Sequence, residues 1–106
     1  MFCFMILLVE YHLAPPGSHK CDDGFFATQD ECQAAALSLT PGTPGRSLQV
    51  GSGGNCLDGS WGQVPLGCSV QSGGDWSAHY KTSGDTGKGC IDSMYQLVCT
   101  HTGNCF

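Results

Sequence analysis

The sequence predicts a small disulfide-rich α+β domain, in which one short helix packs on a small antiparallel β-sheet with long Gly-rich loops. Three observations lead to this fold class. The chain has 106 residues, eight of them are cysteines and sixteen are glycines, and its apolar spacing changes from helical to strand-like after residues 41–45. Because bulky apolar residues are sparse in so short a chain, covalent crosslinks must supply much of its stability.

Residues 1–19 are predicted to form an N-terminal arm followed by a Pro-rich linker. Phe2–Val9 is an unbroken apolar run, too short to span a bilayer and without the basic flank of a signal peptide. A truncated signal peptide is the alternative interpretation. Retention of the run is favoured by cysteine parity, because loss of Cys3 would leave an odd number. The linker contains Pro15 and Pro16, and residues 20–106 then form the disulfide-stapled module.

One helix is predicted after the turn at residues 21–26. Thr28 and Glu31 have the spacing of a capping box, in which a hydroxyl and a carboxylate satisfy reciprocal backbone amides. Small and apolar side chains then recur at helical spacing on a single face, and residues 40–42 end the helix with a Pro-Gly pair. The residues of this face are Cys32, Ala35, Ala36 and Leu39.

Four segments with a period of two are predicted as strands, at residues 46–50, 67–71, 76–81 and 94–99. The middle two flank Ser72-Gly-Gly-Asp75 and are typical of a hairpin. In its second arm, Trp76, Ala78 and Tyr80 share the inner face. Ser77 and His79 then fall on the outer face, which we expect to be solvated.

Charge excludes two classes of partner. The net charge is −5, and the only basic side chains besides histidine are scattered along the chain, at Lys20, Arg46, Lys81 and Lys88. Nucleic acids and anionic membranes both require clustered cations. No Asn-x-Ser/Thr sequon occurs, so glycosylation is expected only as O-linked sugars in the Gly-rich loops.

The cysteines predict an oxidising compartment and hence a secreted or cell-surface protein. Their number is even, the chain is short and its connections are Gly-rich, as in extracellular disulfide scaffolds. Zinc is the alternative, with Cys99, His101 and Cys105 as candidate ligands. Because no close C-x-x-C pair is present and a fourth ligand would come from elsewhere, no metal or cofactor is expected.

Three motifs resemble those of a small cysteine-rich module of secreted and surface proteins from algae and other protists. They are Glu31-Cys32-Gln-Ala-Ala35-Ala36, Pro65-Leu66-Gly67-Cys68 and Leu97-Val98-Cys99, and the similarity covers residues 21–99. The sequence departs from the module in having Lys81 after Tyr80, where Asn is usual. The resemblance implies a fold and an extracellular location, with no particular chemistry.

The resemblance also implies a disulfide pairing. Four cysteines are common to the module, and their implied pairs are Cys21 with Cys99 and Cys32 with Cys68. The additional Cys56 and Cys90 would then form a third bridge. Under the same scheme Cys3 pairs with Cys105. Eight cysteines permit many other connectivities.

Three groups of polar residues were considered as chemical sites. Asp75, Ser77 and His79 contain the side-chain types of a hydrolase triad, but a solvated strand face is the simpler interpretation. Residues 84–89 are similar to a phosphate-binding loop without its Ser or Thr, and are expected to be a flexible loop. Acidic residues near the helix start offer oxygen ligands to Ca²⁺, although interaction with the helix dipole explains them; they are Asp22, Asp23, Asp30 and Glu31.

Two non-enzymatic functions remain. The first is an extracellular structural protein that self-associates as a matrix or filament subunit, with its apolar arm docked into a neighbouring copy. The arm residues are Phe2, Phe4, Ile6, Leu7, Leu8 and Val9. The alternative is a carbohydrate-binding or adhesive module with an aromatic platform of Trp61, Trp76 and Tyr80. In a domain so poor in aliphatic residues, a place in the core is the favoured interpretation for these aromatics. Expected partners are therefore other copies of the chain or extracellular glycans, with no membrane span.

Overall fold

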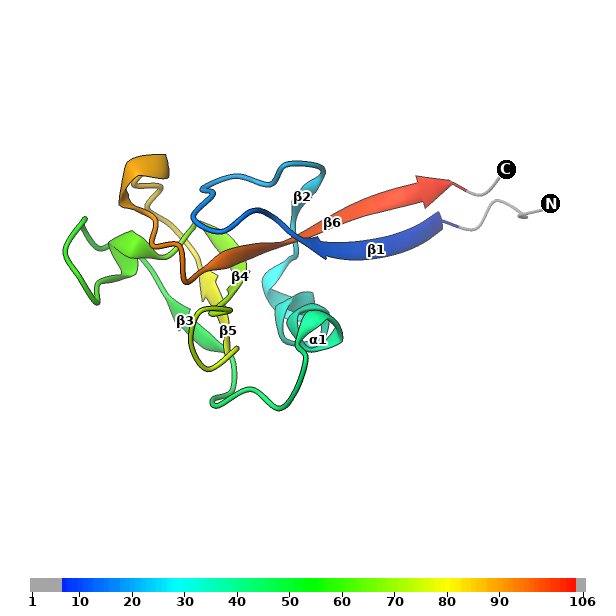
Figure 1. Cartoon of the computed structure of the whole chain (residues 1–106). Helices are drawn as coiled ribbons and strands as arrows, with labels where there is room; N and C mark the ends of the chain where they lie inside the picture. The colour runs from blue at the N-terminus through cyan, green and yellow to red at the C-terminus, as the bar shows by residue number, and fades with distance from the viewer. Residues whose placement is uncertain (1–6, 105–106) are drawn as a thin grey trace.

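The structure, a computed structural model, describes residues 7–104 (Figure 1). Within that range it has one α-helix, six strands and two short 3-10 turns. The helix is α1 (Gln29–Leu39), the strands are β1 (Leu7–Leu13), β2 (Phe25–Phe26), β3 (Gln49–Gly51), β4 (Gly67–Val70), β5 (Ala78–Lys81) and β6 (Gln96–Asn104), and the turns are η1 (Trp61–Gln63) and η2 (Lys88–Cys90). The predicted α+β class, a helix packed on a mostly antiparallel sheet, is confirmed.

The long strand β6 organises the sheet, whose strand order is β1-β6-β4-β5-β3. One edge of β6 pairs with β1, from Val98 to Asn104. Its other edge pairs with β4 at the start and then with β2. All of these pairs are antiparallel, as is β4 with β5. The pairing of β3 with β5 is parallel, whereas an antiparallel sheet was expected from the sequence.

Helix α1 covers one face of the sheet. It begins after Thr28, whose backbone N–H donates to Glu31 Oε1 at 2.9 Å, and the side chains of its buried face, Cys32, Ala35 and Ala36, contact the core. The other Glu31 oxygen accepts a hydrogen bond from Tyr11 Oη at 3.0 Å. The helix predicted from its capping box and apolar face is thus confirmed, and Glu31 also ties it to β1.

Loops cover much of the opposite face. The segment that follows β1 crosses β6, and its Ala14 is completely buried against Leu97 and Cys99. Further along the sheet, the connections that contain η1 and η2 place Val64 and Ile91 in buried positions. As a result the central strands are buried on both faces, and all four residues of β4 are inaccessible to solvent.

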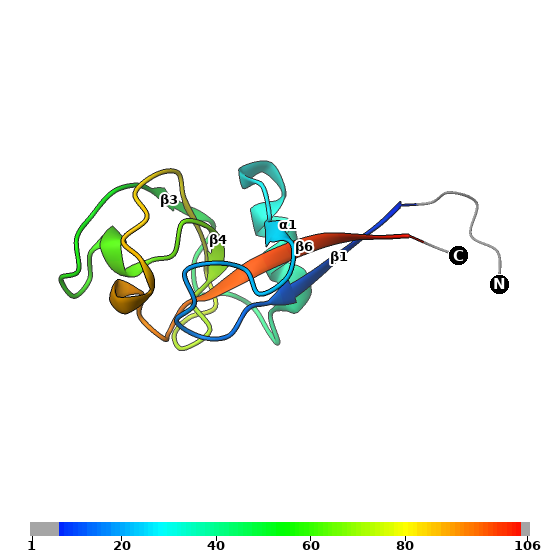
Figure 2. The ribbon, with the colours of Figure 1, turned by 90° about the horizontal axis from the view of Figure 1, so that it is seen from above.

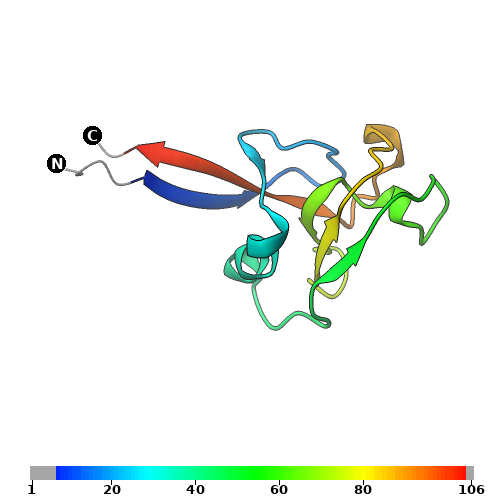
Figure 3. The ribbon, with the colours of Figure 1, turned by 180° about the vertical axis from the view of Figure 1, so that it is seen from behind.

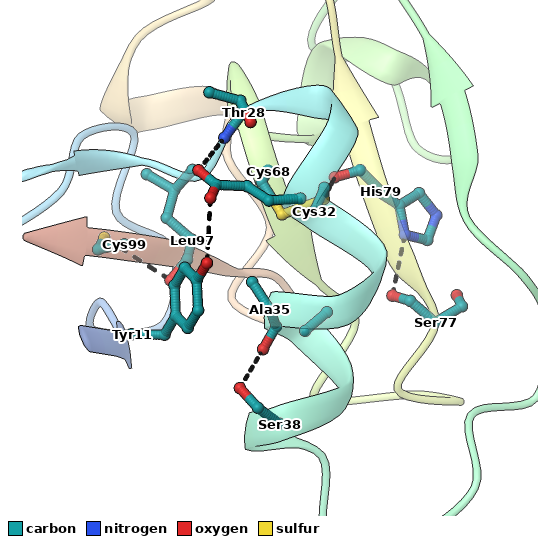
Figure 4. Close-up of a disulfide and its surroundings, with 12 residues drawn as sticks. Tyr11, Thr28, Cys32, Ala35, Ser38, Cys68, Ser77, His79, Leu97 and Cys99 are labelled. Atoms are coloured by element: carbon teal, nitrogen blue, oxygen red, sulfur yellow. Dashed lines mark hydrogen bonds between the residues drawn. A yellow bond between two sulfur atoms is a disulfide. The ribbon is translucent and has the colours of Figure 1, made fainter. Parts of the chain in front are cut away.

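Three disulfides staple this body. Cys32 joins α1 to Cys68 of β4 (Figure 4), Cys21 joins the loop after β1 to Cys99 of β6, and Cys56 joins Cys90 between two loops. These are the same pairs that the resemblance implied. The expected Cys3–Cys105 pair lies outside the described residues. Crosslinks of this kind indicate an oxidising compartment.

The outer parts of β1 and β6 project from the body as a two-stranded ribbon (Figures 1 and 3). The view from above shows α1 lying beside only the inner part of these strands (Figure 2). The molecule is therefore elongated, with principal extents of 51 × 28 × 21 Å. We call residues 7–10 together with 101–104 the ribbon.

The N-terminal segment differs from its prediction. Residues 12–14 were expected in a linker outside the module, yet β1 runs to Leu13 and Ala14 is completely buried. The physical reason is that Tyr11 and Leu13 pack on the core beside α1. The alternation that places Tyr11 and Leu13 on the core follows an unbroken apolar run to Val9, which itself has no period of two.

The second arm of the hairpin also differs. Trp76 has a φ of 61° and belongs to the turn, so β5 begins at Ala78. The prediction that Ser77 and His79 are solvated is wrong, because they are 0% and 5% exposed. Their position on the face opposite Ala78 and Tyr80 was anticipated correctly, but loops cover that face.

Candidate functional site

A hollow of about 210 Å³ opens on the sheet face opposite α1. Its walls come from β3, β5 and η1 and from loop residues that adjoin β3, β4, η1 and β6. Polar and aromatic side chains predominate in the lining, and those used below are Arg46, Gln49, Trp61, Gln71, His79 and Tyr95. We call this feature the hollow.

The strand pairing explains how residues distant in sequence meet here. Gln49 of β3 lies directly beside His79 of β5 in the parallel register. Gly51 is required two residues later, because a Cβ atom there would lie 2.1 Å from the Trp61 ring. The absence of a side chain at this position lets η1 lay Trp61 against the strand.

His79 lies between two other aromatic rings. Its centroid is 5.6 Å from that of Trp61 and 5.3 Å from that of Tyr95, which it meets edge to face. Such arrangements suit the positive edge of one ring and the negative face of another. Burial lowers the pKa of His79, so the imidazole is neutral at neutral pH.

A hydrogen-bonded network supports one side of the hollow. Arg46 Nε donates to Asp75 Oδ2 at 2.7 Å, and its Nη2 donates to Gln71 Oε1 at 2.8 Å and to Ser77 Oγ at 3.2 Å. The Arg46 guanidinium and the Ser77 hydroxyl together hold the pKa of Asp75 far below its usual range. The network therefore keeps a paired, ionised carboxylate next to the hollow.

The predicted hydrolase residues are close together but are not arranged as a nucleophile and base. Ser77 Oγ donates to Asp75 Oδ1 at 2.6 Å, whereas His79 Nδ1 contacts the backbone oxygen of Ser77 at 3.2 Å (Figure 4). A histidine base would have to accept the hydroxyl proton. The geometry instead gives that proton to a carboxylate already bound by Arg46.

The three predicted platform aromatics lie on different faces of the sheet. Trp76 and Tyr80 are partly buried and pack on the core cluster beneath α1, and Tyr80 meets Phe26 edge to face. Trp61 lies on the other face, in the hollow. Of the predicted platform, only Trp61 therefore lines the hollow, where Tyr95 also lies.

The polar members of the hollow gave no recognisable signal in the sequence. Arg46 and Gln49 lie more than twenty positions before Gln71, and none of the three belongs to a motif. Their meeting depends on the parallel β3–β5 pair and on the turn that contains Asp75, whose carbonyl accepts from Gly45 N at 2.8 Å. Only a correct topology would have placed them together.

Several of the candidate metal ligands are engaged in other interactions, and Cys105 lies outside the described residues. Cys99, expected in the zinc alternative, is in a disulfide with Cys21. Its sulfur lies near the side chains of His12 and Asp22, but a disulfide sulfur is not the thiolate that metals require. His12 Nε2 is itself 2.8 Å from Asp22 Oδ1. Glu31, a calcium candidate, is bound to Tyr11 and to the Thr28 amide.

Lys81 is an unexpected feature of the same sheet face. It is 1% exposed, and its Nζ donates to the Val64 carbonyl at 3.2 Å. Burial lowers its pKa. This lysine stands where the resembled module usually has Asn, and here its long side chain fills the space beneath the η1 loop.

The fold and the bridges define a class: a small α+β domain stapled by disulfides. Searches among protein-family models, curated proteins and solved structures find no match for this chain. The resemblance to the algal and protist module therefore stays a prediction. No helix within residues 7–104 is long and apolar enough to cross a membrane.

Proposed function

We propose that this protein is a non-enzymatic, secreted or cell-surface structural subunit whose copies associate through the ribbon. The single observation that carries the proposal is the open outer edge of β1, which stands last in the strand order. An unprotected strand edge offers a row of backbone donors and acceptors to another chain. The disulfides support an extracellular location.

The register identifies which backbone groups face outward. Ala14 N donates to Leu97 O at 2.9 Å, so this pair is hydrogen-bonded, and antiparallel pairs alternate between bonded and non-bonded. Counting back along the register, residues 8, 10 and 12 bond to β6. The N–H and C=O groups of residues 7, 9, 11 and 13 therefore point away from β6, toward the open edge.

The ribbon has little of its own to stabilise it. Val9 is 54% exposed, and a two-stranded ribbon without a covering layer is marginally stable in water. Edges are usually protected by lysine, proline or a β-bulge. Strand β1 contains no lysine or proline, and its register with β6 is continuous. The Glu10–His101 contact at 3.0 Å joins the two strands across the ribbon and leaves the edge free.

The route of association differs from simple docking of a free arm. Leu7, Leu8 and Val9 pair with β6 of their own chain, while Phe2, Phe4 and Ile6 lie outside the described residues. A second edge is open on β6 beyond Thr100, the last residue of β6 that pairs with β2. Pairing of β1 in one copy with this part of β6 in the next would be heterologous, and such contacts propagate into filaments.

Sedimentation velocity over a range of concentrations tests the proposal with two variants of Val9. Val9→Pro removes an N–H that points outward, so the ladder to β6 keeps its bonds while the edge loses a donor. Val9→Thr keeps the N–H and the β-branched shape. We expect assemblies for the unmodified chain and for Val9→Thr, and a monomer for Val9→Pro. A monomeric unmodified chain, or equal assembly of both variants, contradicts the proposal.

A further inference from the structure

We propose that the hollow binds one uncharged pyranose residue of a glycan. This inference does not depend on self-association, since the ribbon and the hollow are built from different residues. It rests on three properties of the hollow: a buried histidine in its lining, hydrogen-bonding groups left without protein partners, and a neutral, aromatic lining of limited size.

Burial of polar side chains at this face costs stability. Ser77 and His79 are almost completely buried, and so is Ser69, which lies directly opposite His79 in the β4–β5 register. The Ser69 hydroxyl has no hydrogen-bond partner among the described residues. Ser77 is paired with Arg46 and Asp75, but the Ser69 hydroxyl and the buried His79 ring cost free energy, because buried polar groups are unfavourable unless they are fully paired. A binding role accounts for His79, which lines the hollow.

Several groups of the lining are free to bond a ligand. Across residues 7–104, no hydrogen bond involves Arg46 Nη1, the Tyr95 hydroxyl or Gln49 Oε1, although the other polar atoms of Arg46 and Gln49 are engaged. Together they provide two donors on a fixed guanidinium, one hydroxyl and one amide acceptor. A ring that carries several hydroxyl groups matches this mixture, because each hydroxyl both donates and accepts.

The electrostatics favour an uncharged ligand. Arg46 is the only formally charged side chain of the lining, and Asp75 neutralises it at 2.7 Å. His79 adds no charge at neutral pH, because burial lowers its pKa. An acidic sugar would meet a guanidinium already paired with Asp75, and a cationic ligand would be repelled by Arg46.

The size and the rings restrict the ligand further. The hollow holds about 210 Å³, below the roughly 300–1,000 Å³ of pockets that enclose drug-sized molecules. It therefore accommodates a single ring at the end or a branch of a glycan. Trp61 and Tyr95 offer aromatic surface to the apolar C–H groups of such a ring.

Tryptophan fluorescence provides a direct test, since the chain has only two tryptophans. Trp76→Phe leaves Trp61 as the sole reporter, inside the hollow. We expect at least one of the methyl glycosides of glucose, galactose, mannose and N-acetylglucosamine to change its emission in a saturable way at millimolar concentration. Methyl glucuronide, with its carboxylate, should bind more weakly than that glycoside.

Two matched tyrosine variants in this background locate the site. Tyr95→Phe removes only a hydroxyl of the hollow and should raise the Kd roughly tenfold, equivalent to about 1.4 kcal/mol. Tyr80→Phe makes the same change beneath α1 and should leave the Kd unaltered, and thermal melts establish that both variants fold. No saturable response to any of the four glycosides, stronger binding of the glucuronide, or equal effects of the two variants overturns the proposal.

Discussion

The body and the ribbon share strand β6 but differ in what covers it. From Leu97 to Thr100 the strand has backbone neighbours on both edges, and Leu97, Val98 and Cys99 are completely buried. Beyond Thr100 it pairs only with β1. The comparison teaches that the layers around a strand, rather than the strand itself, decide whether it is a structural element or an available edge.

The covalent crosslinks show the same contrast. All three bridges among the described residues lie in the body and connect segments 34, 36 and 78 positions apart. Two of them include completely buried cysteines, Cys32 with Cys68 and Cys99. The body is therefore held by covalent staples, whereas the ribbon described here is held by the strand pairing of β1 with β6.

The largest expected effect comes from removal of a staple of the body. Replacing both Cys32 and Cys68 with Ala should lower the free energy of unfolding by about 3–5 kcal/mol, because the bridge restricts the unfolded chain and its sulfur atoms fill the core. Urea denaturation would measure this loss. The Cys56→Ala, Cys90→Ala variant is a matched control with a similar loop but more exposed positions, and we expect about 2–3 kcal/mol. Equal losses would contradict a role for burial.

A smaller effect is expected from a methyl group at the start of β4. Gly67 has a φ of 96°, and a Cβ atom would lie 2.2 Å from the Phe26 ring. Gly67→Ala should therefore cost about 2 kcal/mol or more. Gly87 has a φ of 81° with no atom near its Cβ position, so Gly87→Ala should cost about 1 kcal/mol. Comparable melting temperatures for the two variants would show that the body is less tightly packed than described.

The hydrogen bond between the helix and β1 should have a moderate effect. Tyr11→Phe removes the bond from Tyr11 Oη to Glu31 Oε2, and the expected loss is about 0.5–1.5 kcal/mol in urea denaturation. Glu10→Gln, on the exposed part of the ribbon, should change the free energy of unfolding by less than about 0.5 kcal/mol. A larger loss for Glu10→Gln would mean that the ribbon contributes more to stability than the contact with α1.

The smallest expected effect is a gradual pH dependence centred on His79. Its pKa in the folded protein lies below the ordinary 6.5 because of burial, so the unfolded chain takes up the proton first. Stability should be full above about pH 6.5 and should decline as the pH falls through that value toward the folded pKa. Denaturation curves of His79→Gln should lack this decline, and its persistence would assign the titration elsewhere. Asp75 has a strongly lowered pKa in the folded protein, so the stability that it contributes should be present at neutral pH and should be lost only as the pH falls below its ordinary value of 3.8.

Local features of the fold were predictable from the sequence. The capping residues Thr28 and Glu31 and the face of Cys32, Ala35 and Ala36 gave α1, since short-range spacing determines a helix. The alternation around Cys68 likewise gave β4. The pairing of the cysteines followed from the resemblance and not from spacing.

Features that depend on distant segments were not predictable. The parallel pairing of β3 with β5 brings Gln49 beside His79, and no local pattern reports it. The alternation of side chains around His79 was interpreted correctly. The burial of His79, however, depends on the loop that contains η1 and on the segment before Tyr95. The hollow was therefore missed as a group, although Trp61 and His79 had each been considered.

The Cys21–Cys99 bridge has a consequence for mechanical load. In a filament joined through ribbons, tension from a neighbouring copy would travel along β6 and reach Cys99 one residue inside Thr100. There the force passes through a covalent bond into the loop that crosses β6. The hydrogen bonds of the ribbon would break under tension before the crosslinked body unfolded. Each subunit could then extend and re-form its ribbon while its body stayed folded.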